Sequence, residues 1–279
     1  MTAPLLEARN LWVRIPTAQR LVEAVRGISF TVGREKVGIV GESGSGKSMT
    51  GRAVMRLTPP NARIDADVLR FADIDLTSAS ERVMRQVRGR RIAMILQDPK
   101  YSLNPVLTVG KQIAEAFLIH RRVAWAEARE RTLAMLDAVR IRNPRRVFDL
   151  YPHEVSGGMG QRIMIAMMLI PEPDLIIADE PTSALDVTVR LQVLAILDDL
   201  VTDRGLGLMF ISHDLNLVAT FCDRVIIMYA GRIMEELPAA ELERAQHPYT
   251  RALLESLPRP GERRDRLAVM RRDPAWLEA

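Results

Sequence analysis

The sequence predicts an α/β fold: a mostly parallel sheet with helices on both faces. From Asp174 onward, short apolar runs such as "DLIIAD" and "GLMFIS" alternate with stretches of helical period. Strands that alternate with helices are joined by right-handed crossovers, which place helices over both faces of a sheet. A glycine-rich loop at residues 41–48, between a buried strand and a helix, indicates the same class.

The elements can be assigned in order along the chain. Residues 1–40 predict three strands, "LLEARNLWVRI", "RGISFTV" and the buried "KVGIV", and the helix "SMTGRAVMRL" follows the glycine-rich loop. Between about residues 99 and 155, segments such as "AWAEARERTLAMLDAVR" have apolar residues three or four apart, which predicts an inserted helical subdomain. After "DLIIAD" we expect the helix "VTVRLQVLAILDDLVTD", the strand "GLMFIS", a short helix near "DLNLVATF", and the strands "RVIIMYA" and "RIMEEL".

Length and composition favour a soluble, cytosolic chain. Its 279 residues, 48% hydrophobic, can bury a large core as one elaborated domain or two small ones. The start "MTAPLLEARN" does not resemble a signal peptide, and the longest apolar run, Ile163 to Ile170, is too short to cross a bilayer. The single cysteine, Cys222, excludes an intrachain disulfide, and we expect it to be a small buried side chain.

The net charge of +4 raises the possibility of nucleic-acid binding. The densest basic segment, Arg82 to Arg91, has no interleaved aromatic residues and leads into the apolar strand "IAMIL". A solvated helix and turn is therefore the preferred interpretation of this segment. We interpret the arginine-rich tail, Arg259 to Arg272, as a solvated terminus and expect no nucleic-acid partner.

The stretch "GESGSGKS", Gly41 to Ser48, matches the phosphate-loop pattern GxxxxGK[ST] at every position. Glycines let successive backbone N–H groups turn inward, and the helix that starts near Gly46 adds its positive end. Lys47 would reach the β- and γ-phosphates of ATP, and the Ser48 hydroxyl would bind Mg²⁺. An ordinary glycine turn is the alternative. The expected nucleotide-binding residues are Gly41, Glu42, Ser43, Gly44, Ser45, Gly46, Lys47, Ser48 and Met49.

The stretch "LIIADEP" supplies the two acidic groups that phosphoryl transfer needs. The apolar run Leu175 to Ala178 predicts a buried strand, and Asp179 and Glu180 follow it directly. Asp179 would hold Mg²⁺, directly or through water, and Glu180 would act as the general base for the attacking water. The alternative is that two acids end a strand at the solvent.

A second anion-binding turn occurs in "EVSGGMGQR", where Ser156, Gly157 and Gly158 precede an apolar helix. One chain thus has one nucleotide loop and two phosphate cradles. We infer that Ser156 of one subunit completes the site that Lys47 forms in its partner, so that two chains enclose two ATP molecules. A single chain would then bind ATP but hydrolyse it poorly.

Together these motifs resemble the ATP-binding subunits of ABC transporters over essentially the whole chain. The resemblance implies an ABC nucleotide-binding domain over residues 1–245, with a RecA-like P-loop NTPase core, an antiparallel β subdomain and a helical subdomain at about 99–165. It also implies roles for four residues outside the motifs above, and it marks Gly160, in the serine–glycine stretch, as a departure from the family pattern. In "ILQDP", Gln97 would sense Mg²⁺ and the γ-phosphate, and in "ISHDL", His213 would contact the γ-phosphate. In "SALD", Asp186 would cross the dimer interface, and Ile15 would give adenine an apolar contact. Gly160 replaces the Arg or Gln that is usual in the family.

Finer features are similar to the importers of peptides, nickel and opines. They are "QDPKYSLNP", "YPHEVSGGM" and "HPYTRALLESLP", the last within an expected C-terminal extension at 246–279. The similarity implies a second, paralogous ATPase subunit (or a homodimer), two membrane permease subunits, and a periplasmic or extracellular solute-binding protein. The chain would be peripheral, at the cytoplasmic face of the inner (plasma) membrane. Tyr101 and Leu103 would contact the permease or, equally, pack internally.

Two other functions remain as alternatives. A soluble ABC-type ATPase acting on nucleic acid or ribosomes would usually carry two cassettes or a long coiled coil, and this sequence shows neither. An exporter subunit is disfavoured by "HPYT", His247 to Thr250. The sequence leaves the cargo open among peptides, nickel complexes, opines and other small solutes.

Overall fold

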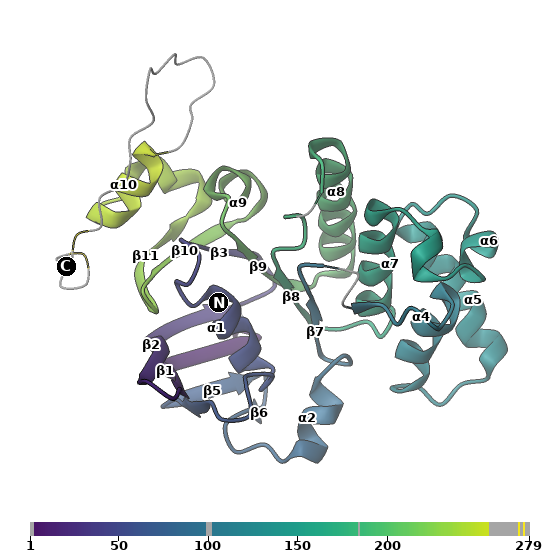
Figure 1. The fold of residues 1–279 in the computed structure, drawn as a ribbon, viewed down its shortest axis with the longest axis horizontal. Helices are drawn as coiled ribbons and strands as arrows, with labels where there is room; N and C mark the ends of the chain where they lie inside the picture. The colour runs from purple at the N-terminus through teal and green to yellow at the C-terminus, as the bar shows by residue number, and fades with distance from the viewer. Residues whose placement is uncertain (1–2, 99–101, 184, 257–272, 274–275, 277–279) are drawn as a thin grey trace. The chain divides into compact units, whose positions relative to one another are not determined.

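The computed structural model describes residues 3–98, 102–183, 185–256, 273 and 276 (Figure 1). The chain forms two compact units, one made of residues 1–77 and 209–279 and the other of residues 78–208. The first unit is therefore built from both ends of the chain. The expected boundary after residue 245 falls inside this unit and stays a prediction.

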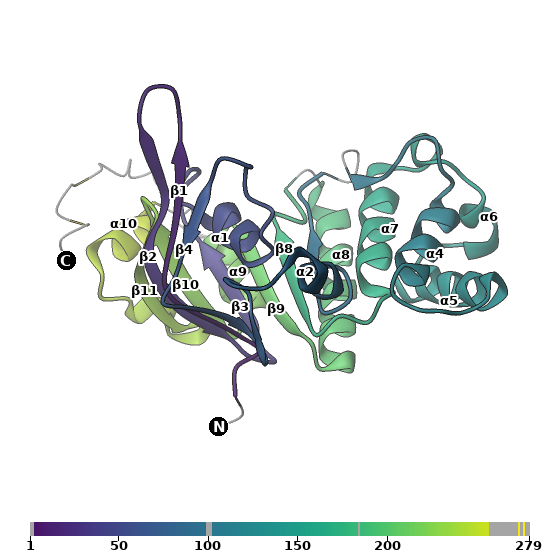
Figure 2. The same cartoon turned by 90° about the horizontal axis from the view of Figure 1, so that it is seen from below.

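The first unit contains an antiparallel sheet with the strand order β2-β1-β5-β6, in which β4 also pairs with β1. Its long strands β1 and β2 form a hairpin (Figure 2), and the expected antiparallel β subdomain is thereby confirmed. The strands are β1 (Leu6–Pro16), β2 (Leu21–Val32), β4 (Arg63–Asp65), β5 (Val68–Phe71) and β6 (Ile74–Asp75). Strands β4 to β6 have two to four residues, too few to show an alternating pattern in the sequence.

The same unit holds the strand that leads into the phosphate loop. Strand β3 (Lys36–Val40) pairs in parallel with β10 (Arg224–Tyr229), which pairs antiparallel with β11 (Arg232–Pro238). Helix α9 (Leu215–Phe221) packs so closely on β3 that a Cβ at Gly38 would lie 2.0 Å from the Val218 side chain. The remaining helices are α1 (Lys47–Val54), the 3-10 helix Ala239–Arg244 and α10 (Pro248–Glu255).

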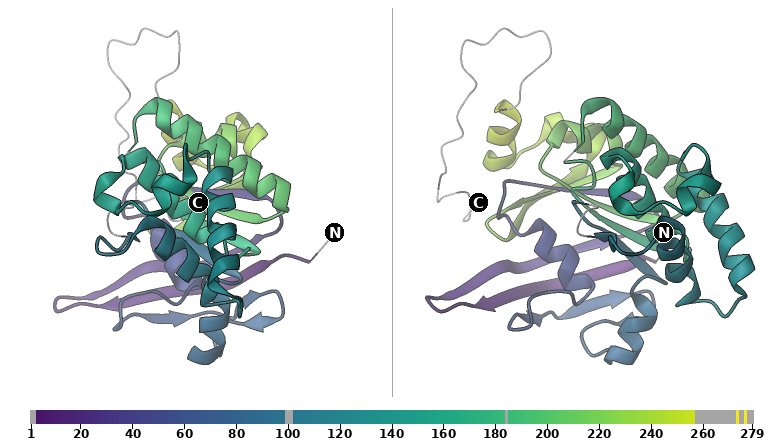
Figure 3. Two further views of the ribbon diagram at one scale, coloured as in Figure 1. Left: turned by 90° about the vertical axis from the view of Figure 1, so that its right-hand side faces the viewer. Right: turned by 45° about the vertical axis from the view of Figure 1, so that its right-hand side comes forward.

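The second unit combines a parallel strand pair with a set of helices (Figure 3). Strand β7 (Ile92–Ile95) pairs with β8 (Leu175–Asp179), and the residues of both strands are buried. Helices α4 and α5 contact each other, and both contact α6 and α7, as expected for a helical subdomain. The helices are α2 (Glu81–Val87), α4 (Val109–Leu118), α5 (Trp125–Ala138), α6 (Pro144–Phe148), α7 (Gly157–Leu169) and α8 (Val187–Arg204). Strand β9 (Gly207–Ser212) spans the division between the units.

Several smaller expectations are confirmed. The basic segment at 82–91 contains most of helix α2 and the turn after it, and Arg82 and Arg85 are exposed. Cys222 is buried, as is Leu103, whose burial favours an internal packing role.

Tyr101 and most of the tail at 260–279 lie outside the described residues. In the part of the chain that the structure describes, no helix has the length and apolar character needed to span a bilayer.

Candidate functional site

The phosphate loop joins buried strand β3 to helix α1, and two of its glycines have left-handed backbone angles. Gly46 has φ 99°, and a Cβ there would lie 2.4 Å from the Ala24 carbonyl oxygen, so only glycine fits. Gly44 has φ 82°, and a Cβ there would meet no atom within 4 Å. The loop is thus closely packed at Gly46 and borders open space at Gly44.

The Lys47 side chain lies inside this loop and is only 5% exposed. Its Nζ donates hydrogen bonds to the carbonyl oxygens of Gly41 and Glu42, both at 2.8 Å, and contacts Ser45 Oγ at 3.4 Å. A buried ammonium needs such acceptors because burial penalises an uncompensated charge. The geometry places a cation at the centre of the loop.

The start of α1 also suits an anion. Gly46 is the N-cap residue and provides no side-chain hydrogen bond to the first turn. The N–H groups of a first turn lack helical partners, and the helix dipole adds positive potential there. The residues present therefore fit the phosphates of a nucleotide.

Neighbouring backbone fixes the position of the loop. The Gly231 N–H donates to the Ser45 carbonyl at 3.0 Å, and the Arg26 N–H donates to the Gly231 carbonyl at 2.8 Å. The Thr50 hydroxyl donates to the Gly46 carbonyl at 3.0 Å. These contacts connect the loop to β2, to the turn between β10 and β11, and to α1, and make it a preorganised site.

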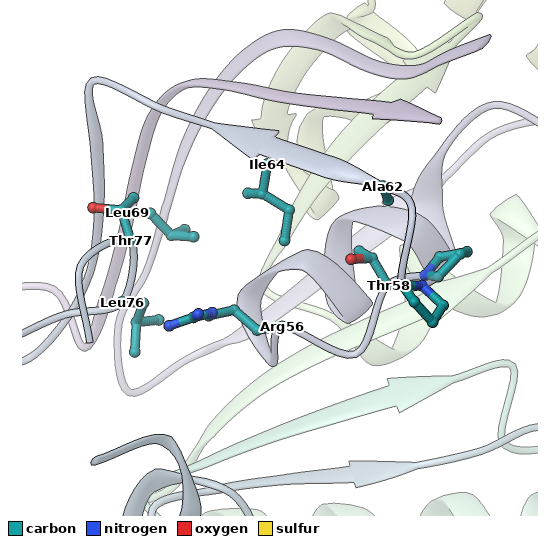
Figure 4. A pocket seen from close by; sticks show the side chains of 9 residues that line it. Arg56, Thr58, Ala62, Ile64, Leu69, Leu76 and Thr77 are labelled. Atoms are coloured by element: carbon teal, nitrogen blue, oxygen red, sulfur yellow. The ribbon is translucent and has the colours of Figure 1, made fainter. Parts of the chain in front are cut away.

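A pocket of about 320 Å³ elsewhere in the first unit is not part of this site (Figure 4). It is lined by Arg56, Thr58, Pro59, Pro60, Ala62, Ile64, Leu69, Leu76 and Thr77. Since no phosphate-loop residue lines it, we do not assign it to nucleotide binding.

The acidic pair lies at the end of β8 in the second unit. Asp179 is 5% exposed, which contradicts the alternative that both acids end a strand at the solvent. The backbone of Glu180 is in the left-handed region, with φ 49°, which is uncommon for a residue other than glycine and is often found at functional sites. The Ser48 hydroxyl and the Asp179 carboxylate are the hard oxygen donors that Mg²⁺ prefers, so these residue types fit the ion.

Gln161 is a candidate positioning residue that the sequence reasoning missed. Its side chain is 1% exposed, and its Nε2 donates to the carbonyl oxygen of Pro181, the residue that follows Glu180. The bond ties α7 to the loop that carries the acidic pair. The signal in the sequence was an amide side chain next to Arg162, close to the start of a helix that is apolar from Ile163 onward.

The serine–glycine turn begins helix α7. Ser156 is the exposed N-cap residue, and its Oγ accepts a long hydrogen bond, 3.4 Å, from the Met159 N–H. The two glycines differ: a Cβ at Gly157 would meet nothing within 4 Å, whereas a Cβ at Gly158 would lie 2.5 Å from Val189 Cγ1. Gly158 is therefore required for packing between α7 and α8, and Gly157 borders open space.

A cavity of about 730 Å³ in the second unit includes Ser156 in its lining and carries a concentration of positive charge. Four arginines line it, namely Arg140, Arg142, Arg146 and Arg162. Burial and the nearby Arg142 charge lower the pKa of the Arg162 guanidinium, and Arg140 forms an ion pair with Asp199 at 2.6 Å. The arginines are spread over more than twenty positions, so the sequence did not reveal the cluster.

The other expected site residues have clear local positions. Asp186 is the N-cap of α8, where its Oδ1 accepts the Val189 N–H at 3.0 Å, a structural role that the sequence reasoning did not weigh. Gln97 is exposed shortly after β7, His213 is exposed between β9 and α9, and Ile15 is half-buried in β1 opposite Val22.

The two units divide the expected site between them. The phosphate loop, Ile15 and His213 belong to the first unit. Gln97, the serine–glycine turn, the acidic pair and Asp186 belong to the second. The roles of these residues toward nucleotide and metal stay predictions.

Comparisons with known proteins agree with this description. A model of the ABC transporter family matches residues 25–183. The chain is 52% identical to a probable peptide ABC transporter ATP-binding protein, y4tR, of Sinorhizobium fredii over 258 residues, 91% of this chain and 77% of the relative. It is 45% identical to the dipeptide transport ATP-binding protein DppD of Bacillus subtilis, with the same coverage of both chains.

A solved structure shows the same fold. It is the dimeric post-hydrolysis state of the ATP-binding cassette MJ0796, bound to ADP and Pi, with a TM-score of 0.75 and 24% identity over 84% of this chain and 98% of that one. The α/β class and the nucleotide-binding architecture expected from the sequence are confirmed. On the family match and on these identities, the chain belongs to the ABC transporter family, as one of its ATP-hydrolysing subunits.

Proposed function

We propose that this chain is the ATP-hydrolysing motor of a membrane importer for peptides or related small solutes, such as nickel complexes and opines. The observation that carries the proposal is the buried Lys47 ammonium, 5% exposed, inside a preorganised loop that is open at Gly44. The names of the relatives, which are 45% and 52% identical, support peptides as the cargo class.

In this proposal, phosphate binding, metal binding and activation of the attacking water are assigned to different residues. Lys47 and the loop N–H groups bind the β- and γ-phosphates, and His213 contacts the terminal phosphate. Ser48 and Asp179, with Gln97, would hold Mg²⁺, which neutralises charge on the phosphate oxygens when bound. Glu180 orients the attacking water and accepts its proton.

Two chains would complete each other's sites. Ser156 and the adjoining glycines would bind the terminal phosphate held by the partner's loop, and Asp186 would lie at the interface. The open space at Gly157 and the four arginines in the neighbouring cavity support an anion at this turn. The dimeric state of MJ0796 also supports the arrangement.

The assembly would include further subunits. We propose a paralogous ATPase as the second motor subunit, with a homodimer as the alternative, two membrane permeases, and a periplasmic or extracellular solute-binding protein. The chain would lie at the cytoplasmic face of the inner membrane. Copurification of permease subunits supports this assembly, whereas copurification of RNA or DNA would support the alternative of a nucleic-acid or ribosome ATPase.

Lys47→Ala tests the phosphate loop. We expect loss of measurable ATP affinity in a binding titration on the full chain, because the central cation is removed. Unchanged affinity would contradict the assignment.

Glu180→Gln tests the base. ATP binding is expected to persist and to trap a closed dimer, with turnover reduced by roughly two orders of magnitude or more. Near-normal hydrolysis by the assembled transporter would remove Glu180 from this role. Transport assays with ligands of the solute-binding protein would identify the cargo.

A further inference from the structure

The peptide unit between Gly41 and Glu42 is held from both sides. Its carbonyl oxygen, on Gly41, accepts a hydrogen bond from Lys47 Nζ at 2.8 Å. Its N–H, on Glu42, donates a long hydrogen bond, 3.4 Å, to the hydroxyl oxygen of Tyr249. Because one rigid peptide plane carries both groups, a change in one contact reorients the other.

Tyr249 comes from the far end of the chain, in the second position of α10. The start of this helix is firmly held: the Tyr249 N–H donates to Nδ1 of His247 at 3.1 Å, and Pro248 lies at the first helical position. The N–H groups of Gln246 and His247 in turn donate to the Glu235 carboxylate of β11, at 2.7 and 3.2 Å. The start of α10, which carries Tyr249, is thus anchored to strand β11.

The Tyr249 ring is fully buried in an aromatic cluster with Tyr229 and Trp276. The ring centroids of Tyr249 lie 4.6 Å from Tyr229 and 5.4 Å from Trp276, the separations at which aromatic pairs attract. Tyr229 ends β10, the strand that pairs with β3. The aromatic contacts hold the Tyr249 ring in place, so its hydroxyl has a fixed position next to the phosphate loop.

We propose that Tyr249 is a positioning residue for nucleotide binding: its hydroxyl orients the Gly41–Glu42 peptide, whose Gly41 carbonyl in turn holds the Lys47 ammonium. Tyr249 acts through the loop and does not itself touch the phosphates. The inference rests on the proposed role of the loop and adds that the segment after residue 245 is part of the nucleotide site. A C-terminal helix thereby influences ATP affinity.

The test compares two variants that each remove a single hydroxyl from the same cluster. Tyr249→Phe keeps the ring and deletes the acceptor of the Glu42 N–H. Tyr229→Phe is the matched control, because among the described residues the Tyr229 hydroxyl makes no hydrogen bond. Both variants keep the aromatic rings, so a difference between them reports the Tyr249 hydroxyl and not the ring packing.

We expect Tyr249→Phe to weaken ATP binding to the full chain by about threefold to tenfold, the factor that corresponds to loss of one hydrogen bond. In the assembled transporter, KM for ATP should rise similarly, while kcat changes less than about twofold, as for loss of binding that is equal in the ground state and the transition state. The melting temperature should stay within about 3 °C of wild type, and Tyr229→Phe should match wild type in all three measurements.

Two results would overturn the inference. One is ATP affinity within about twofold of wild type in Tyr249→Phe, because an orienting contact contributes more than this. The other is an equal loss of affinity in Tyr229→Phe, which would assign the effect to general packing. Failure of the proposed function is distinguishable, since it would appear as normal ATP binding by Lys47→Ala.

Discussion

The adjacent glycines of the serine–glycine turn should respond oppositely to the same substitution. In Gly158→Ala the new methyl would lie 2.5 Å from Val189 Cγ1, against about 3.5–4.0 Å for an ordinary carbon–carbon contact. Helix α7 or Val189 must then move by roughly 1 Å. Such overpacking costs about 1–3 kcal/mol, and the helix preference of alanine returns up to about 1 kcal/mol. We expect a net destabilisation of about 1–2 kcal/mol.

Gly157→Ala is the matched variant, since its methyl would meet nothing within 4 Å. The helix preference of alanine then acts alone, and stability should be unchanged or raised by up to about 1 kcal/mol. ATP turnover in the assembled transporter should nevertheless fall, because the open space at Gly157 is where we place the partner's terminal phosphate. The variant separates folding from function at one position.

Thermal unfolding of the full chain provides the assay. Gly158→Ala should lower the melting temperature by about 2–4 °C, and Gly157→Ala should not lower it. Adding Val189→Ala to Gly158→Ala removes the clashing methyl and should recover part of the loss, compared with Val189→Ala alone. Equal melting temperatures for the two glycine variants, or no recovery in the double variant, would refute the reasoning.

Three further predictions concern stability and reactivity. Gly110→Ala would place a methyl 2.1 Å from the Phe148 ring. It should lower the unfolding free energy, measured by urea denaturation, by about 2–3 kcal/mol. A smaller change than for Gly158→Ala would contradict the close packing of Phe148 on Gly110. Although burial alone raises the pKa of Glu35, its hydrogen bond to Arg224 and the Arg224 charge outweigh this and lower it. The pair therefore stabilises the fold above the usual pKa of a glutamate. Arg224 also pairs with Glu236, so the stability difference between wild type and Arg224→Met reports both pairs and should shrink as pH falls from 7 to about 3. A constant difference would argue against a stabilising role of these pairs. Burial raises the pKa of the Cys222 thiol to about 12, so thiol reagents at about pH 8 should modify it only after denaturation, as absorbance would record.

Local sequence signals predicted the phosphate loop and the elements around it well. Strand β9 has the predicted bounds, and α1 has its N-cap at Gly46, where its start was expected. These features depend on neighbouring residues, whose period and glycines determine local conformation. The N-terminal half of β2, from Leu21, was missed because its apolar and polar residues do not alternate strictly and only Val25 in it is buried.

Long-range and backbone features were beyond sequence reasoning. The contact between Glu42 and Tyr249 joins residues 207 positions apart, and no spacing rule connects them. The left-handed backbone of Glu180 is imposed by surrounding structure, since nothing in glutamate favours it. The N-cap formed by Asp186 could have been predicted, because Asp before an apolar helix is a common N-cap. We assigned Asp186 only to the dimer interface, on the family resemblance.

The assembly of the first unit from both chain ends has a consequence for biosynthesis. When the ribosome has completed residues 1–77, the 131 residues of the other unit must be synthesised before residue 209 begins the missing partner segment. At typical synthesis rates this interval is on the order of ten seconds. During this interval the nascent phosphate loop lacks β10, which pairs with β3, and Tyr249, which contacts Glu42 in the folded chain.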